Sequence, residues 1–212
     1  MKRSTNIKIC GLTKIDDLML AQKLGADYFG FILYNKSPRS ISIKILKKLV
    51  KDININQCVV VDVLPQLDKL EILNDIGFKN FQIHIPKNTD FDTIERLSNL
   101  LGKNALWLAP ELKTLTSFNS NLLKLADTII IDSYSKSQIG GTGRPGDWIG
   151  FKQLNEKYPE ISWGLAGGLN AKNINDAQLK SGASLLDINS GIEKTPGIKD
   201  HNLMVQLFKT LT

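Results

Sequence analysis

Short apolar segments recur along the chain, separated by longer segments in which apolar and polar residues are mixed. Each apolar segment is rich in β-branched or aromatic residues and has the length of a buried β-strand. Eight of them can be distinguished, at residues 7–10, 28–33, 58–63, 80–84, 105–109, 128–132, 162–166 and 184–187. We therefore predict eight strands, each separated from the next by enough residues for a helix.

The segments between the predicted strands carry helix signals. Between the first two strands, Ile15, Leu18 and Ala21 recur at helical spacing. Helix starts and ends are marked by residues that cap free backbone groups or accept a left-handed backbone: Thr13, Ser42, Asp147 and Asn170 at starts, and Gly25, Gly77, Ala126 and Gly182 at ends. Regular alternation of strand and helix predicts a parallel sheet with right-handed crossovers.

Eight such units predict an α/β fold, the (β/α)8 or TIM barrel. A length of 212 residues is near the lower end for this fold, so we expect a single domain over residues 1–212. The hydrophobic content of 42% is ordinary for a globular protein, and no apolar run approaches the roughly 20 residues of a membrane helix. We therefore expect a cytoplasmic protein that does not bind membranes.

Charge and cysteine content restrict the partners. The net charge of +6 comes from lysines spread along the chain, without the dense basic run that nucleic-acid binding requires, so no nucleic-acid partner is expected. The two cysteines, Cys10 and Cys58, match no metal-binding or disulfide spacing, which fits a reducing compartment.

Apolar residues on the outer helices of a barrel serve helix packing or a dimer face equally well, so a monomer and a homodimer both remain open.

Two glycine-containing turns follow the last two predicted strands. Gly167 and Gly168 end the seventh strand, and Ser190 and Gly191 come directly after the eighth. Glycines let backbone N–H groups approach an anion closely, and a helix that starts just beyond adds the positive end of its dipole. In TIM barrels a phosphate site lies after strands 7 and 8. We therefore predict a phosphorylated small-molecule ligand.

The carboxyl ends of the other strands are polar, and in a TIM barrel they surround one active site. Candidates there are Cys10, His84, Asp132 and Asp187. Cys10 and Asp132 lie on opposite sides of the predicted barrel, where a thiol and a carboxyl can take and give a proton in one turnover. Spacing alone does not decide which is the acid. A buried, purely structural cysteine and an aspartate that caps a turn are the alternatives.

Five motifs in order along the chain resemble those of the phosphoribosylanthranilate isomerases of tryptophan biosynthesis. They are KICGLT at 8–13, KSPR at 36–39, GGTG at 140–143 with DW at 147–148, LAGGL at 165–169 and DINSGIE at 187–193. The resemblance covers essentially the whole chain. It implies a TIM barrel and an isomerase that uses neither a metal nor an organic cofactor.

The resemblance also implies roles for individual residues. Asp132 is the expected general acid and Cys10 the expected general base of an Amadori rearrangement, which converts N-(5-phosphoribosyl)anthranilate to 1-(2-carboxyphenylamino)-1-deoxyribulose 5-phosphate. Arg39 is expected to bind the anthranilate carboxylate, because a guanidinium matches a carboxylate in two parallel hydrogen bonds. The remaining expected contacts are phosphate binding by Gly167, Gly168, Ser190 and Gly191, and orientation of ribose hydroxyls by His84 and Asp187.

Two alternatives remain on the same fold. One is another phosphosugar isomerase or epimerase, although a metal-dependent epimerase needs several His and Asp ligands and the chain has two histidines. The other is a non-catalytic barrel that binds a phosphorylated ligand. The loop at 133–146 contains four glycines and is long for a β/α connection, which predicts a cover over the site, with an ordinary flexible surface loop as the alternative.

Overall fold

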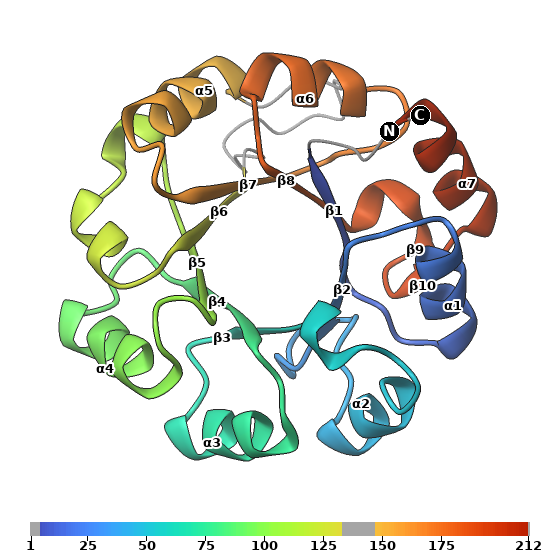
Figure 1. Ribbon diagram of the computed structural model, residues 1–212, viewed down its shortest axis with the longest axis horizontal. Helices are drawn as coiled ribbons and strands as arrows, with labels where there is room; N and C mark the ends of the chain where they lie inside the picture. The colour runs from blue at the N-terminus through green and yellow to red at the C-terminus, as the bar shows by residue number, and fades with distance from the viewer. Residues whose placement is uncertain (1–4, 133–146, 212) are drawn as a thin grey trace.

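The computed structural model describes residues 5–132 and 147–211. Its barrel strands are β1 (Asn6–Ile9), β2 (Tyr28–Ile32), β3 (Cys58–Val63), β4 (Asn80–Ile85), β5 (Leu106–Pro110), β6 (Thr128–Asp132), β7 (Ser162–Ala166) and β8 (Leu185–Ile188). They form one closed parallel barrel in sequence order, with β8 paired to β1. Helices surround this barrel on the outside (Figure 1). The predicted (β/α)8 architecture is confirmed, with every predicted strand within one or two residues of the observed one.

The α-helices are α1 (Ile15–Lys23), α2 (Ile43–Leu49), α3 (Leu67–Ile76), α4 (Phe91–Leu101), α5 (Trp148–Lys157), α6 (Ile174–Ser181) and α7 (His201–Thr210). A short 3-10 helix, η1 (Ile55–Gln57), precedes β3, and another, η4 (Ser190–Ile192), follows β8. Among the described residues, none of these helices combines the length and apolar character that crossing a bilayer requires.

The expected helix between β5 and β6 is replaced by two 3-10 helices, η2 (Leu115–Ser117) and η3 (Ser120–Lys124). The segment is rich in Ser, Thr and Asn, whose side chains compete for backbone hydrogen bonds. The Ser117 hydroxyl donates to the Thr114 carbonyl, and the Asn119 side chain accepts from the Asn121 N–H. The prediction that Ala126 follows an α-helix was therefore wrong.

Several predicted helix caps are confirmed. Ser42 accepts from the Ile45 N–H and Asp147 from the Gly150 N–H, while Gly77 and Gly182 end their helices with φ of 108° and 63°. Thr13 does not cap α1 as expected. Its hydroxyl instead donates to the Gly197 carbonyl at 2.8 Å, a contact between residues 184 positions apart.

The start of α6 also differs from the prediction. Its N-cap position is Asn173, and Asn170 lies three residues earlier in a turn. There the Asn170 side chain accepts from the Lys172 N–H at 2.9 Å, and the Asn170 N–H donates to Asn173 at the same distance. The two asparagines together shape the loop that leads from β7 into α6.

Side chains of the strands alternate between two apolar layers. On β3, Cys58 and Val60 pack outward against the helices, whereas Val59 and Val61 face the barrel interior. This alternation follows from the two-residue period of a strand. Tyr28 and Trp107 meet edge to face inside the barrel, with ring centroids 5.0 Å apart.

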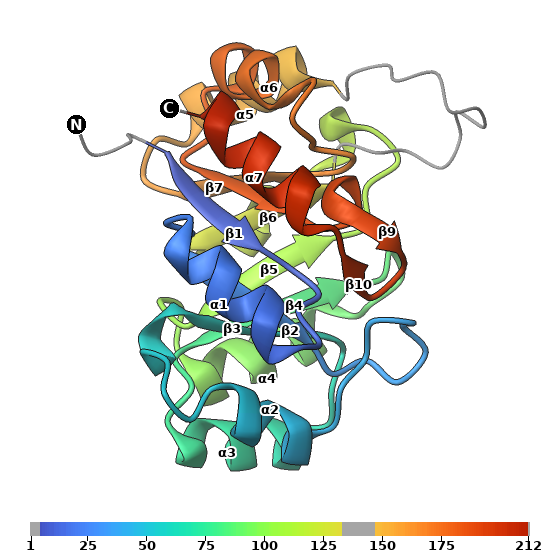
Figure 2. The same cartoon turned by 90° about the vertical axis from the view of Figure 1, so that its right-hand side faces the viewer.

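A two-stranded antiparallel hairpin, β9 (Glu193–Thr195) and β10 (Ile198–Lys199), follows η4. The sequence pattern did not predict it, because its strands are only three and two residues long. Figure 2 shows the hairpin at the end of the barrel toward which the β4 and β5 arrows point. It therefore lies beside the carboxyl ends of the strands, where the predicted site residues are.

Candidate functional site

A cavity of about 1110 Å³ opens at the carboxyl ends of the barrel strands. It is lined by residues from most of the strands and the loops that follow them. Among its lining residues are these predicted site residues: Cys10, Arg39, His84, Asp132, Gly167, Gly168, Asp187 and Ser190. Gly191 is the one predicted site residue that does not line it. The fold thus brings the candidate acid, base and anion-binding groups to one cavity.

A buried ion pair connects the first and last strands of the barrel. Lys8 and Asp187 are register partners on β1 and β8, and both point to the interior. Lys8 Nζ lies 2.7 Å from Asp187 Oδ2, and the Lys8 side chain is completely buried. Burial disfavours the charged form of Lys8, but the charge and hydrogen bond of Asp187 outweigh this and raise its pKa. Asp187 Oδ1 is buried without a hydrogen-bond partner among the described residues.

Cys10 follows β1 and is 4% exposed. Because strand side chains alternate, it lies on the same face as Lys8. Gly30 on β2 provides space for both, since a Cβ there would lie 2.9 Å from Cys10 Sγ and 3.1 Å from Lys8 Cε. Burial raises the pKa of the Cys10 thiol, although the charge of Lys8 opposes this. The thiol is therefore protonated at neutral pH in the free protein.

Asp132 is the last residue of β6 and is exposed. Its strand partner is Ala166 at the end of β7, and Ile130, two residues earlier, faces the barrel interior. Asp132 and Cys10 line the same cavity from different strands. A carboxyl and a thiol thus border one cavity large enough for a phosphorylated aromatic sugar derivative.

His84 and Gln82 share the inner face of β4. The two side chains approach each other at 3.3 Å between Gln82 Nε2 and His84 Nε2. Burial, followed by the charge of Lys8, lowers the pKa of His84, so its ring is neutral at pH 7. Gln82 Oε1 is buried and has no partner among the described residues. With Asp187 Oδ1, the cavity wall therefore presents two hydrogen-bond acceptors that suit hydroxyl groups.

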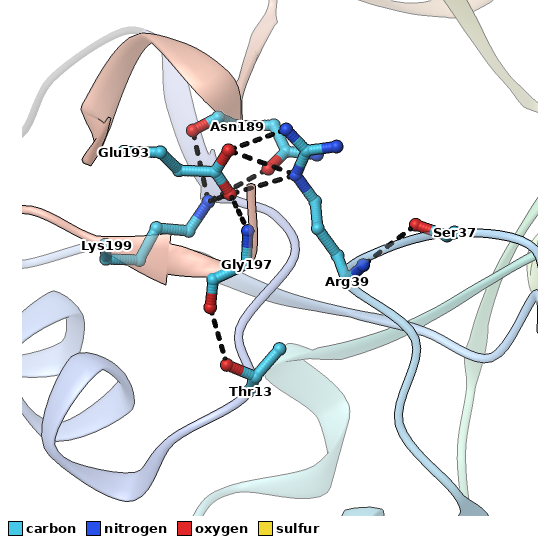
Figure 3. Close-up of polar contacts among 7 residues, drawn as sticks. All are labelled: Thr13, Ser37, Arg39, Asn189, Glu193, Gly197 and Lys199. Carbon is cyan, nitrogen blue, oxygen red and sulfur yellow. Dashed lines mark hydrogen bonds and ion pairs between the residues drawn. The ribbon is translucent and has the colours of Figure 1, made fainter. Parts of the chain in front are cut away.

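Arg39 lies in the β2–α2 loop and forms a bidentate ion pair with Glu193 of β9 (Figure 3). Arg39 Nε is 2.9 Å from Glu193 Oε1, and Nη2 is 2.6 Å from Oε2. The hydrogen bonds from Arg39 to Glu193 raise the pKa of the guanidinium. The family resemblance implied that a substrate carboxylate takes two parallel hydrogen bonds from Arg39. The edge formed by Nε and Nη2 is already paired with Glu193, which leaves the Nη1–Nη2 edge for such a ligand.

The two glycine turns lie where the sequence predicted. Gly167 and Gly168 have φ of 101° and 65°, which glycine adopts without strain. Asn170 and Asn173 each donate to the Gly168 carbonyl at 3.0 Å and hold this loop. A Cβ on Gly191 would collide with the Leu169 carbonyl oxygen. The absence of a side chain at Gly191 thus allows the turn after β8 to pack against the turn after β7.

Four residues beside the cavity were not assigned roles from the sequence: Lys8, Gly30, Gln82 and Glu193. Lys8 and Gln82 had a detectable signal, because each lies two residues before a predicted site residue and hence on the same strand face. Glu193 is the last residue of the DINSGIE motif, but only the tertiary structure shows that it contacts Arg39. The loop 133–146, including the GGTG motif and the predicted cover, lies outside the described residues. Within the described part, no group of His, Cys, Asp or Glu is arranged to hold a metal ion.

Comparisons with known proteins identify a family. Residues 7–210 match the family model described as N-(5'phosphoribosyl)anthranilate (PRA) isomerase. An N-(5'-phosphoribosyl)anthranilate isomerase of Zymomonas mobilis subsp. mobilis is 34% identical, with 98% of both chains covered. The crystal structure of phosphoribosyl anthranilate isomerase from Thermotoga maritima superposes with a TM-score of 0.80 at 24% identity, with 98% of both chains covered.

A further solved structure is a phosphoribosyl anthranilate isomerase in complex with reduced 1-(o-carboxyphenylamino)-1-deoxyribulose 5-phosphate. It has a TM-score of 0.76 and 23% identity, with 98% of both chains covered. At this identity the likeness concerns the fold.

Proposed function

The chain belongs to the N-(5'-phosphoribosyl)anthranilate isomerase family, and from this premise we propose how its residues carry out the reaction. The reaction is an Amadori rearrangement of N-(5'-phosphoribosyl)anthranilate to 1-(2-carboxyphenylamino)-1-deoxyribulose 5-phosphate, an isomerisation within tryptophan biosynthesis. The observation that carries the proposal is the single cavity that Cys10, Asp132, Arg39 and the two glycine turns line together. An acid, a base and two anion-binding elements are what this substrate requires.

Asp132 acts as the general acid. It donates a proton to the furanose ring oxygen, the C1′–O bond breaks, and the nitrogen lone pair forms the C1′=N iminium. A carboxyl at the exposed end of β6 reaches the cavity while its backbone is held in the sheet, which suits proton delivery to a bound sugar.

Cys10 acts as the general base. The iminium acidifies the C2′ proton, which Cys10 removes to give an enolamine, and this tautomerises to the aminoketose. The positive charge of Lys8 favours the thiolate and partly offsets the effect of burial. Cys10 must act as the thiolate: the cationic iminium in the cavity favours loss of the thiol proton to solvent, and the thiolate then accepts the C2′ proton.

Binding groups hold the two ends of the substrate. Gly167, Gly168, Ser190 and Gly191 bind the phosphate through backbone N–H groups, and Arg39 binds the anthranilate carboxylate through its Nη1–Nη2 edge. His84 and Asp187 orient the ribose hydroxyls, for which the unpaired Asp187 Oδ1 is a suitable acceptor. Anchoring both ends places C1′ and C2′ between the acid and the base.

The test is turnover by purified protein. Freshly prepared N-(5'-phosphoribosyl)anthranilate is added, and the fall in the fluorescence of its anthranilate group is followed. We expect an enzyme-dependent fall and formation of the aminoketose. If the substrate binds without being converted, the non-catalytic alternative replaces this proposal, and if neither occurs the substrate assignment is wrong.

The role of Asp132 has a matched control just before the same strand. Asp132→Asn is expected to lower kcat by about 10²–10⁴-fold, the usual contribution of a positioned proton donor. Asp127→Asn changes an exposed aspartate that precedes β6 at the opposite end of the barrel and should leave kcat unchanged. Wild-type turnover by Asp132→Asn would exclude Asp132 as the acid.

A further inference from the structure

The β9–β10 hairpin forms a polar cluster with the β2–α2 loop (Figure 3), and Arg39 of this cluster lines the cavity. Glu193 on β9 accepts hydrogen bonds from Arg39 Nε and Nη2 and from the Gly197 N–H, the last at 3.2 Å. Lys199 on β10 donates to Glu193 Oε1 at 3.1 Å. The Glu193 side chain is 3% exposed and that of Arg39 is 18% exposed. A carboxylate buried to this extent is held in one orientation by four donors.

Lys199 also holds Glu193 in place. Its Nζ donates to Glu193 Oε1, to the Asn189 carbonyl oxygen at 3.1 Å and to Asn189 Oδ1 at 2.9 Å. Burial lowers the pKa of Lys199, but three acceptors around one amine, one of them a carboxylate, require the ammonium form, so Lys199 is charged. Glu193 is charged as well: burial opposes its ionisation, but the hydrogen bonds from Arg39 and the charge of Lys199 lower its pKa.

The cluster therefore carries one excess positive charge, with the two cations Arg39 and Lys199 around the single anion Glu193. Lys199 is completely buried and its donors are all used, whereas Arg39 lines the cavity. The Nη1 group of Arg39 makes no hydrogen bond to the part of the chain that the structure describes. The unbalanced charge is thus presented on the Nη1–Nη2 edge of the guanidinium, where a second carboxylate has room for two parallel hydrogen bonds.

The aliphatic part and backbone of Arg39 are confined as well. A Cβ on Gly11 would lie 2.9 Å from Arg39 Cδ, and a Cβ on Gly197 would lie 3.1 Å from the Pro38 carbonyl oxygen. The Arg39 N–H donates to the Ser37 hydroxyl at 3.2 Å. The β1–α1 loop and the hairpin therefore leave the arginine side chain little freedom, and Glu193 determines its direction.

We propose that Glu193 is a positioning residue that sets substrate specificity: by holding one edge of Arg39, it aims the other edge at the ring carboxylate of the substrate. This inference rests on the proposed function, because it takes the carboxylate-bearing aromatic amine as the ligand. The new element is that the preference for a ring with a carboxylate over an unsubstituted ring depends on the C-terminal hairpin. Selection arises because a cluster with an excess positive charge and a prearranged donor pair binds a carboxylate far better than an unsubstituted ring.

The experiment compares two stable ligands that differ only in the carboxylate. One is reduced 1-(o-carboxyphenylamino)-1-deoxyribulose 5-phosphate, and the other is the same compound with an unsubstituted phenyl ring. Dissociation constants are measured for the wild type, Glu193→Gln, Arg39→Met and the double variant. Asp62→Asn is the matched control, because Asp62 is also a buried carboxylate with a lysine partner, 2.5 Å from Lys69 Nζ, but holds no cavity-lining arginine.

We expect Glu193→Gln to weaken binding of the carboxylate ligand by roughly 10–100-fold, because a misdirected guanidinium loses charge-assisted hydrogen bonds to the ligand, and this loss outweighs the added positive charge of the cluster. Binding of the phenyl ligand should change by less than about threefold. Arg39→Met should show the same selectivity loss, and the double variant should be no worse than Arg39→Met alone, since both changes remove one interaction. Asp62→Asn should leave the ratio of the two dissociation constants unchanged.

Three results would overturn the inference: equal weakening of both ligands by Glu193→Gln, additive effects in the double variant, or no change at all. If Glu193→Gln does not fold, as judged by thermal unfolding, Glu193→Asp serves instead. It keeps the charge beside Lys199 but is too short to hold both Arg39 nitrogens, so it should lose part of the selectivity, and full wild-type selectivity would also refute the inference. Turnover of N-(5'-phosphoribosyl)anthranilate by the wild type tests the proposed function separately.

Discussion

The two cysteines of this protein show how different the two faces of one barrel are. Cys10 and Cys58 are both buried, one directly after β1 and the other at the start of β3. Cys58 begins β3 and faces outward into the apolar layer beneath the helices, where burial alone raises the pKa of its thiol to about 12. Cys10 faces inward, where the charge of Lys8 works against burial and the cavity is within reach. The same side chain is thus a packing residue on one face and a candidate base on the other.

The difference extends to the neighbouring residues. The outward side chains of β1 are Ile7 and Ile9, completely buried and apolar, while Lys8 between them points inward. The inner face near the carboxyl ends also carries His84 and Asp187, and it retains buried acceptors without partners among the described residues. A folded protein tolerates unpaired buried acceptors mainly where a ligand or water satisfies them. The outer face builds stability, and the inner face is built for binding.

The largest expected effect comes from exchanging the two thiols for hydroxyls. Cys10→Ser should lower kcat by about 10²–10⁴-fold, because a hydroxyl is a far weaker base in the same position. Cys58→Ser should leave kcat unchanged and lower the free energy of unfolding by about 1–3 kcal/mol, the cost of a poorly paired buried hydroxyl. Steady-state kinetics and urea denaturation measure the two effects. Similar kcat values for both variants would show that the inward thiol contributes no more to catalysis than the outward one.

A smaller effect is expected from removing the buried cation. Lys8→Met leaves Asp187 as an unpaired charge inside the barrel and should lower the free energy of unfolding by about 3–5 kcal/mol. Lys69→Met breaks the Asp62 pair, where the lysine side chain is 30% exposed and water can replace it, so its cost should be smaller. Urea denaturation of both variants provides the comparison. An equal or greater loss of unfolding free energy for Lys69→Met would show that the interior Lys8–Asp187 pair contributes no more to stability than the more exposed pair.

The smallest effect concerns the ionisation of Cys10. Only the thiolate reacts with iodoacetamide, and the pKa of Cys10 is raised, so alkylation in a Cys58→Ser background should be slow at pH 7. The rate should increase about tenfold per pH unit and continue to rise above pH 8.5, the ordinary value for a free thiol. Mass spectrometry of the modified protein follows the reaction, with glutathione as the reference thiol. A plateau below pH 8 would show that Lys8 outweighs burial.

Much of the site was predictable because two local regularities suffice for it. Strands have a two-residue period, and all carboxyl ends of a parallel barrel meet at one edge. Cys10, His84, Asp132 and Asp187 were therefore expected at one cavity, and the glycine turns after β7 and β8 were expected beside them. Their chemical roles came from the motifs rather than from the pattern, and they stay predictions until the variants are measured.

The sequence by itself determined the strands, most helix ends and the set of polar groups at the cavity, since each depends on neighbouring residues. Only the tertiary structure decided which of these groups are paired. Lys8 meets Asp187 across 179 positions because the barrel closes, and Arg39 meets Glu193 across 154 because the C-terminal hairpin packs on the β2–α2 loop. For the same reason, the Thr13 hydroxyl donates to the Gly197 carbonyl and does not cap α1. Contacts of this range depend on the packing of whole elements, which no local spacing encodes.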